Sequence, residues 1–184
     1  MSEDRREAYY HDRVRQSGPQ YQGFDLTSVE ILLSLLYTED VLQQACGPYL
    51  GQYGLSKSSV NILMLLRHGP VEGLQLHDLG DLLLVSRANI TGLIDHLEEK
   101  GYVRRVVDQQ DRRAKFARIT KKGEALLDAF MPLHYRRIKT MLKGLSEDEK
   151  EILLALLKKT RASIGENADG LDKEPAVAEV MIAE

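Results

Sequence analysis

The chain of 184 residues concentrates its positive charge in one short segment. Between Lys100 and Lys122 it holds nine basic side chains against two acidic ones, an excess of seven positive charges. Because the formal net charge of the chain is −3, the other 161 residues carry a net charge of −10. Basic side chains at this density bind polyanions such as DNA phosphates, although a solvated surface run without a partner is the simpler alternative. The nine are Lys100, Arg104, Arg105, Arg112, Arg113, Lys115, Arg118, Lys121 and Lys122.

A second candidate surface lies just before this segment, on a predicted helix from Ser86 to Lys100. Apolar residues at helical spacing define its buried face: Ile90, Leu93, Ile94 and Leu97. The opposite face centres on Ala88, Gly92 and Asp95, flanked by Asn89, Thr91 and His96, with Arg87 at the N-terminal edge. Glycine in an exposed helix interior costs about 1 kcal/mol relative to alanine. Unless Gly92 is an idle surface residue, it indicates a partner that approaches closely, as the DNA major groove does.

The other reactive residue types do not form a catalytic or metal-binding motif. His77 and Asp81 have the i, i+4 spacing of two metal ligands, but two ligands do not complete a site. Cys46 is the single cysteine, so no intrachain disulfide can form. There is no Walker or Rossmann glycine pattern, no nucleophile elbow and no metalloprotease histidine motif. We therefore expect no enzyme activity, no cofactor and no bound metal.

The first strong element is a helix predicted to begin at Thr27 and to end at Gly47-Pro48. Thr27 and Glu30 have the spacing of a capping box. Apolar residues cover more than one face of this helix, and a chain of this length lacks the mass to bury it alone. We therefore expect a second copy of the chain to bury the remaining apolar surface of this helix. The preceding residues read as a polar arm that could support a short helix.

The middle of the chain predicts a helix-turn-helix arrangement. Ser56 is expected to cap a helix that ends before Gly69-Pro70, and the leucines from Leu74 to Leu83 predict a short helix. Leu84-Val85 then connects tightly to the Ser86 helix.

A hairpin and two long helices follow. Residues 102–107 and 114–119 predict two strands, and the long tip between them carries two adjacent arginines suited to a minor groove. Thr120 is expected to cap a helix toward Met141, bent near Pro132, and Ser146 to Glu149 forms a capping box for the last helix. Lys121 and Lys122 place positive charge at a helix N-terminus, where the helix dipole disfavours it. A nearby phosphate group would offset this repulsion.

These segments resemble the MarR family of bacterial and archaeal transcription regulators. The resemblance lies in Leu55-Ser56, Leu74, Leu79, Val85–Thr91, Leu97–Gly101, Asp111–Arg113 and Ile119–Gly123. It implies a homodimer of winged helix-turn-helix subunits, mainly α with a small β-hairpin wing, whose N- and C-terminal helices mediate dimerisation. The resemblance extends from about Thr27 to Ile164, and it implies a dimerisation helix (27–54), a winged helix-turn-helix DNA-binding domain (55–123) and C-terminal dimerisation helices (124–164). The N-terminal arm (1–26) and the tail (165–184) that we expect lie outside the resemblance.

The resemblance also assigns DNA-binding residues. Those on the recognition helix are Ser86, Arg87, Asn89 and Thr91, and those on the wing are Asp111, Arg112, Arg113 and Lys115. Gly92 joins the DNA-binding residues because of its place on the outer face of that helix. Arg113 would enter the minor groove, oriented by Asp111, while Arg112 and Lys115 contact phosphate. Asp95 would accept from a cytosine amine, discourage other bases or remain a surface charge. A two-fold dimer implies a pseudo-palindromic operator with half-sites about 34–36 Å apart.

A small aromatic or anionic effector that weakens DNA binding is implied as well. Candidate lining residues are Tyr37, Tyr53, Met64 and His68, with Arg136 or Arg137 to meet an anion. Core packing or solvated surface is the alternative for each. Some relatives sense oxidants through a cysteine near the start of the first helix. Cys46 lies near its end, with no basic residue close in sequence, which favours a buried, inert thiol.

We therefore expect a sequence-specific DNA-binding transcription regulator, a repressor that its effector releases. The alternative is a winged-helix module whose basic hairpin docks an acidic protein without binding promoters. The small, hydrogen-bonding residues around Gly92 favour DNA. No stretch approaches the ~20 apolar residues that span a membrane, and the N-terminus lacks a signal-peptide core. The expected location is cytoplasmic, with no membrane partner.

Overall fold

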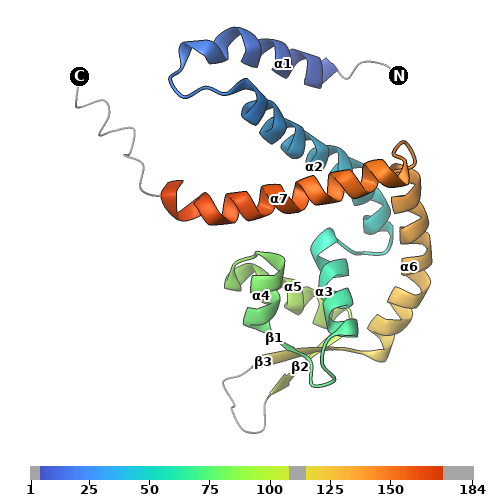
Figure 1. Ribbon diagram of the computed structural model, residues 1–184. Helices are drawn as coiled ribbons and strands as arrows, with labels where there is room; N and C mark the ends of the chain where they lie inside the picture. Colours follow the sequence, from blue (N-terminus) through green and yellow to red (C-terminus); the bar gives the residue numbers. More distant parts are fainter. Residues whose placement is uncertain (1–4, 108–114, 172–184) are drawn as a thin grey trace. The chain divides into compact units, whose positions relative to one another are not determined.

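The computed structural model describes residues 5–107 and 115–171, and it divides the chain into two compact units, Met1–Leu127 and Asp128–Glu184 (Figure 1). The protein is mainly helical with one small antiparallel sheet, which confirms the predicted fold class. The elements are α1 (Arg5–Ser17), the 3₁₀ turn η1 (Gly18–Gln20), α2 (Leu26–Gln52), α3 (Lys57–His68), β1 (Leu74–Gln75), α4 (Leu76–Leu83), α5 (Arg87–Glu99), β2 (Val103–Val107), β3 (Lys115–Ile119), α6 (Lys121–Met141) and α7 (Glu147–Leu171). In the described part of the chain, no helix is both long and apolar enough to span a membrane.

The start of α2 differs from the sequence prediction. Asp25, not Thr27, caps the helix, because its Oδ2 accepts a hydrogen bond from the Ser28 amide at 2.9 Å. Glu30 does not reach back to the cap. Its Oε1 lies 3.1 Å from His11 Nδ1 and accepts from Arg15 Nε at 3.0 Å. The predicted capping box is therefore wrong, since the Glu30 carboxylate holds α1 against α2.

The end of α2 also differs, because Pro48 lies inside the helix. Tyr49 and Leu50 are buried, with 8% and 5% of their surface exposed, and their packing favours continuation of the helix past Pro48, although Pro48 has no N–H to donate to the Gln44 carbonyl. The helix ends after Gln52, and Gly54 takes up the left-handed conformation at φ +63°.

A core shared by α3, α4, α5 and the sheet fixes the orientation of α5. The buried side chains of α5 are Ile90, Ile94 and Leu97, each at most 1% exposed. They are three of the four residues predicted for this stripe, and the fourth, Leu93, is half-buried. Helix α5 contacts α3, α4 and β2. The other core residues of these elements are Val60, Ile62, Leu63, Leu66, Leu79, Val103 and Ala117.

The sheet has the strand order β1-β3-β2, with both pairs antiparallel. The predicted hairpin is confirmed: Val103 pairs with Ile119 and Val107 with Lys115. The strand β1 was not predicted, because Leu74 was assigned to the helix that follows. Gly73, at φ +99°, permits the pairing, since a Cβ atom there would lie 2.3 Å from the Ala117 carbonyl oxygen.

The other predicted caps are confirmed. Ser56 Oγ accepts from the Ser59 amide at 3.1 Å, and Thr120 Oγ1 accepts from the Gly123 amide at 3.1 Å. Ser146 and Glu149 form the reciprocal capping box that begins α7. Helix α6 continues through Pro132 to Met141.

The two helices of the helix-turn-helix end in the same way, but with different residues. After α5, Gly101 is left-handed at φ +73°, and the Tyr102 amide donates to the Leu97 carbonyl at 2.9 Å. After α4, Leu84 occupies the equivalent position at φ +53°, and the Val85 amide donates to the Gly80 carbonyl at 2.9 Å. Both patterns are Schellman-type endings, which favour glycine at the left-handed position. Leu84 is 93% exposed, so its side chain gains little from burial.

Leu84→Gly is expected to raise the free energy of unfolding by about 1 kcal/mol, because glycine adopts the left-handed conformation without strain. Leu82→Gly is the control, since Leu82 is an exposed leucine inside α4 and glycine there should lower stability by about 1 kcal/mol. Urea unfolding at one fixed protein concentration measures both. A less stable Leu84→Gly variant would contradict the backbone assignment.

Candidate nucleic-acid interface

The outer face of α5 presents small and polar side chains to solvent. Arg87, Ala88, Asn89, Thr91 and Gly92 are all exposed. A Cβ atom built on Gly92 would meet no atom within 4 Å, so this position is open. Burial of the opposite stripe leaves this face as the accessible surface of the helix, as predicted.

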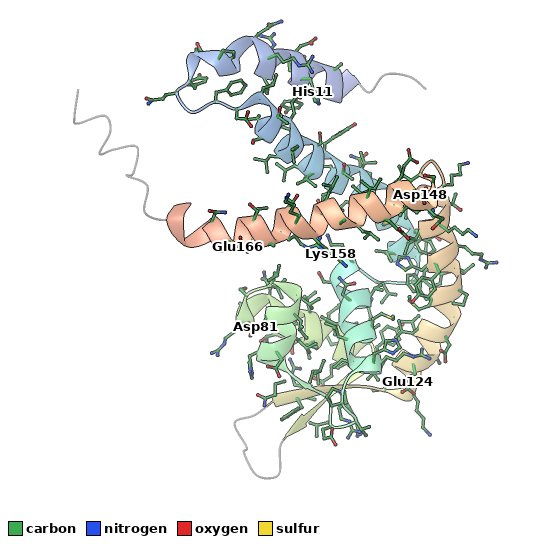
Figure 2. All side chains as sticks on the ribbon, in the orientation of Figure 1. His11, Asp81, Glu124, Asp148, Lys158 and Glu166 are labelled. Atoms are coloured by element: carbon green, nitrogen blue, oxygen red, sulfur yellow. The ribbon has the colours of Figure 1, made fainter. Side chains whose placement is uncertain are left out.

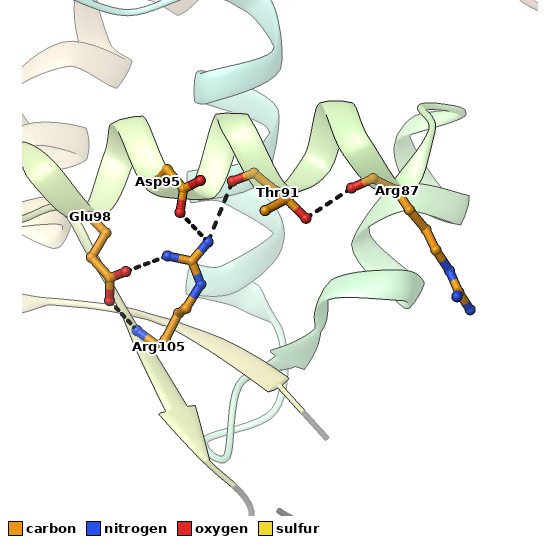
Figure 3. A network of polar contacts seen from close by, with 5 residues as sticks. All are labelled: Arg87, Thr91, Asp95, Glu98 and Arg105. Atoms are coloured by element: carbon orange, nitrogen blue, oxygen red, sulfur yellow. Dashed lines mark hydrogen bonds and ion pairs between the residues drawn. The ribbon is translucent and has the colours of Figure 1, made fainter. Parts of the chain in front are cut away.

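Local hydrogen bonds fix the first turn of this face. Ser86 Oγ accepts from the Asn89 amide at 3.4 Å, which confirms Ser86 as the N-cap of α5. Thr91 Oγ1 donates to the Arg87 carbonyl at 2.9 Å, so the hydroxyl retains its acceptor capacity. The Arg87 side chain extends away from the helix (Figure 3). The exposed groups therefore include a guanidinium, an amide and a hydroxyl, which suit base edges and phosphates.

Arg105, on β2, forms a network with α5 (Figure 3). Its Nη2 pairs with Asp95 Oδ1 and its Nη1 with Glu98 Oε2. The same Nη2 lies 3.4 Å from the Thr91 carbonyl oxygen, and the Arg105 amide donates to Glu98 Oε1 at 2.7 Å. Arg105 thus bonds to three successive turns of α5 and joins the first strand of the hairpin to that helix.

The network also raises the pKa of the Arg105 guanidinium. Partial burial acts to lower the pKa of its guanidinium, but the hydrogen bonds and charges of Glu98 and Asp95 outweigh it and raise the pKa above its ordinary value. The side chain is 26% exposed and stays cationic.

Several cations of the basic segment have partners within the protein. Lys100 Nζ donates to the Gly54 carbonyl. Lys122 Nζ donates to the Lys100 carbonyl at 2.7 Å and lies 5.1 Å from the centre of the Tyr102 ring. Lys122 therefore lies at the C-terminus of α5, where the helix dipole favours a cation. This contact explains its position at the start of α6 without phosphate.

The predicted wing residues are only partly described. Asp111, Arg112 and Arg113 lie outside the described residues, and the side chain of Lys115 does too. What the structure places is the base of the hairpin: β2 contacts α5, and β3 lies between β1 and β2.

Two of the predicted effector-binding residues line a hollow in the first unit. Met64 and His68 on α3 border an open hollow of about 570 Å³, together with Asn61, Leu65, Gly69, Leu74, Leu82 and Leu83. Tyr37 and Tyr53 are not among these residues. Tyr37 is half-buried on α2, and the Tyr53 ring contacts Tyr49 edge to face, with the centroids 5.5 Å apart. Arg136 and Arg137 are exposed on α6.

The other candidates form no site among the described residues. His77 Nε2 pairs with its neighbour Asp78 at 2.9 Å, and no group of three metal-ligating side chains occurs in the described part of the chain. Cys46 is half-buried.

Comparison with known proteins identifies the family of this chain. A model described as MarR family matches residues 53–114. The HTH-type transcriptional regulator MhqR of Bacillus subtilis (strain 168) is 34% identical over 129 residues, which cover 70% of this chain and 86% of that protein. The chain belongs to the MarR family. This membership confirms the expectation of a transcription regulator rather than an enzyme.

Two further relatives of this MarR-family chain bear on its function. The HTH-type transcriptional repressor YetL of Bacillus subtilis (strain 168) is 29% identical over 147 residues, or 80% of this chain and 88% of that protein. The crystal structure of the S. aureus MepR–DNA complex is similar in fold, with a TM-score of 0.64 and 28% identity, covering 72% of this chain and 96% of that chain. Their names associate one with repression and the other with DNA.

The sequence reasoning missed the roles of Arg105 and Glu98. Arg105 was counted in the basic segment but given no partner, and Glu98 was assigned no role. Strand alternation was the available signal, since Arg105 shares a face of β2 with the buried Val103. Glu98 follows Asp95 by three residues, so both carboxylates lie on neighbouring turns of α5.

Substitution by alanine at two helical glycines, Gly92 and Gly123, is expected to change the free energy of unfolding in opposite directions. Gly92→Ala should raise the free energy of unfolding by about 0.5–1 kcal/mol, because the site is open and alanine favours helix. Gly123→Ala should lower it by about 1–3 kcal/mol, because the new Cβ atom would lie 2.3 Å from the Tyr102 carbonyl oxygen. Thermal and urea unfolding measure both, and equal effects would contradict the open environment of Gly92.

Proposed function

We propose that this chain is a sequence-specific regulator that places α5 in the DNA major groove and the hairpin beside it. The observation that supports this most strongly is the outer face of α5, which is exposed, polar and open at Gly92. An open helix face of this kind can approach base edges closely. The related protein MepR has a crystal structure in complex with DNA, which supports DNA as the partner of this chain.

Individual roles follow from side-chain chemistry. Arg87 and Asn89 suit bidentate contacts to guanine and adenine edges, and Ser86 and Thr91 suit phosphate or base contacts. On the wing, we propose that Arg113 enters the minor groove while Asp111 orients it. Arg112 and Lys115 would contact phosphate. The segment 55–123 would form the DNA-binding domain.

A homodimer would present two such surfaces to a pseudo-palindromic operator. In the first unit, α2 exposes large apolar side chains: Ile31, Leu32, Leu36, Val41 and Leu42. In the second unit, α7 exposes Ile152, Leu153, Leu154, Leu156 and Ile164. Apolar surface of this extent on two helices supports association with a second copy. We propose that segments 27–54 and 124–164 mediate this association, with the arm (1–26) and tail (165–184) outside it.

We further propose that the protein is a repressor released by a small aromatic or anionic effector. The name of the related repressor YetL supports the direction of regulation. The hollow beside Met64 and His68 has a volume in the range of small-molecule sites and a largely apolar lining. It lies against α4, so an occupant can bias the position of the helix that precedes α5. A coupling free energy of about 1–3 kcal/mol between effector binding and DNA binding is enough to change the affinity for DNA severalfold or more.

Arg87→Ala is expected to weaken binding to DNA from upstream of the coding region. Because one phosphate or base contact by a cation is lost, the slope of log affinity against log salt should fall in magnitude by about one. Arg13→Ala removes an equal charge from α1, outside both proposed interfaces, and is the control. Gel shifts at several salt concentrations measure both slopes. Unchanged binding by Arg87→Ala would exclude Arg87 from the interface, and no DNA binding by the wild type would overturn the proposed function.

An effector that occupies the hollow should stabilise the protein. At 100 times its dissociation constant, the ligand should add about 2.7 kcal/mol to the free energy of unfolding, which a thermal-shift screen of aromatic carboxylates detects. Met64→Trp, which places a larger side chain in the hollow, should reduce or abolish the shift, whereas Tyr53→Phe should retain it. A shift that persists undiminished in Met64→Trp would place the effector elsewhere.

A further inference from the structure

Three carboxylates of α5 oppose its proposed use: Asp95, Glu98 and Glu99, of which Glu99 is exposed and lies seven residues after Gly92, on the same face. Asp95 and Glu98 are 53% and 37% exposed, and Asp95 lies on the same outer face as Gly92. A carboxylate on a surface that approaches DNA repels phosphates over a distance comparable to the Debye length, which is about 10 Å at 0.1 M salt. A DNA-binding surface built on α5 must therefore offset these charges.

Arg105 is placed to offset the charges of Asp95 and Glu98, although its own guanidinium does not face the proposed DNA partner. Its guanidinium bonds to the carboxylates of Asp95 and Glu98 and lies beside the Thr91 carbonyl oxygen, so its N–H donors point at α5. The side chain is more buried than either partner, at 26% exposed. The Arg105 amide also donates to Glu98, so the backbone of β2 is tied to α5 at the same point.

Arg104 provides a contrast on the same strand. Its side chain is exposed, and it alternates with Arg105 across β2. The two adjacent arginines therefore have different surroundings: one is bound within the protein and the other is open to solvent. Arg104 and Arg105 carry the same charge, but only Arg105 bonds to the carboxylates of α5.

We propose that Arg105 is a positioning residue of the DNA-binding surface, which neutralises Asp95 on the outer face of α5 and fixes β2 against that helix. This inference rests on the proposed function. It makes Asp95 a tolerated negative charge rather than a reader of cytosine, and it makes the Arg105 side chain one of the contacts that hold the hairpin against α5.

The test compares affinity for one DNA fragment among Arg105→Ala, Arg104→Ala, Asp95→Asn and the double variant Arg105→Ala/Asp95→Asn. Arg105→Ala should weaken binding by roughly tenfold at low salt and by less at high salt, because salt screens the uncovered carboxylates. The double variant should recover most of that loss, since the amide no longer repels phosphate. Asp95→Asn alone should bind at least as well as the wild type. Circular dichroism verifies that each variant is folded.

Recovery of DNA affinity when Asp95→Asn is added to Arg105→Ala is a result that a purely structural role of Arg105 would not produce. If the double variant binds as weakly as Arg105→Ala, or if Asp95→Asn alone weakens binding, the inference is overturned while the proposed function stands. A deficit in Arg104→Ala equal to that of Arg105→Ala would overturn it as well, because lost charge alone would then account for the effect. If Arg105→Ala does not fold, the single Asp95→Asn variant still decides. Failure of the wild type to bind any DNA would overturn both proposals.

Discussion

Burial of one stripe of α5 is the constraint on which the rest of the protein depends. Ile90, Ile94 and Leu97 have almost no exposed surface, so rotation of the helix about its axis would expose apolar side chains at a cost of several kcal/mol. That cost fixes which residues face solvent. The polar face centred on Gly92 is therefore determined by the core, and no partner is needed to present it.

Electrostatics then distinguishes the cations that are open to a partner from those that serve the fold. The chain is acidic overall, and its basic segment is the exception. Within that segment Arg105, Lys100 and Lys122 bond to carboxylates or carbonyl oxygens of the protein, and they fasten β2, α5 and α6 to their neighbours. Arg104 and Lys121 are exposed. A count of basic residues thus overestimates the charge available to a polyanion, while the position of the positive segment beside α5 remains informative.

Features encoded locally could be predicted from the sequence, and features that depend on distant residues could not. The caps at Ser56 and Ser86 and the buried stripe of α5 each follow from a few neighbouring residues, and all three were predicted. The passage of α2 through Pro48 depends on the burial of Tyr49 and Leu50, and β1 depends on pairing with a strand about 40 residues later. The site shows the same division: its exposed face was predicted, whereas the Arg105 network required knowledge of how β2 lies on α5.

Hydrogen exchange with and without operator DNA tests the central claim most directly, because it reports on every backbone amide of the protein at once. The account predicts that DNA slows exchange most strongly in residues 86–107 and 115–119, which comprise α5 and the strands of the hairpin. Protection centred on α1 or α7, with α5 unchanged, would contradict it.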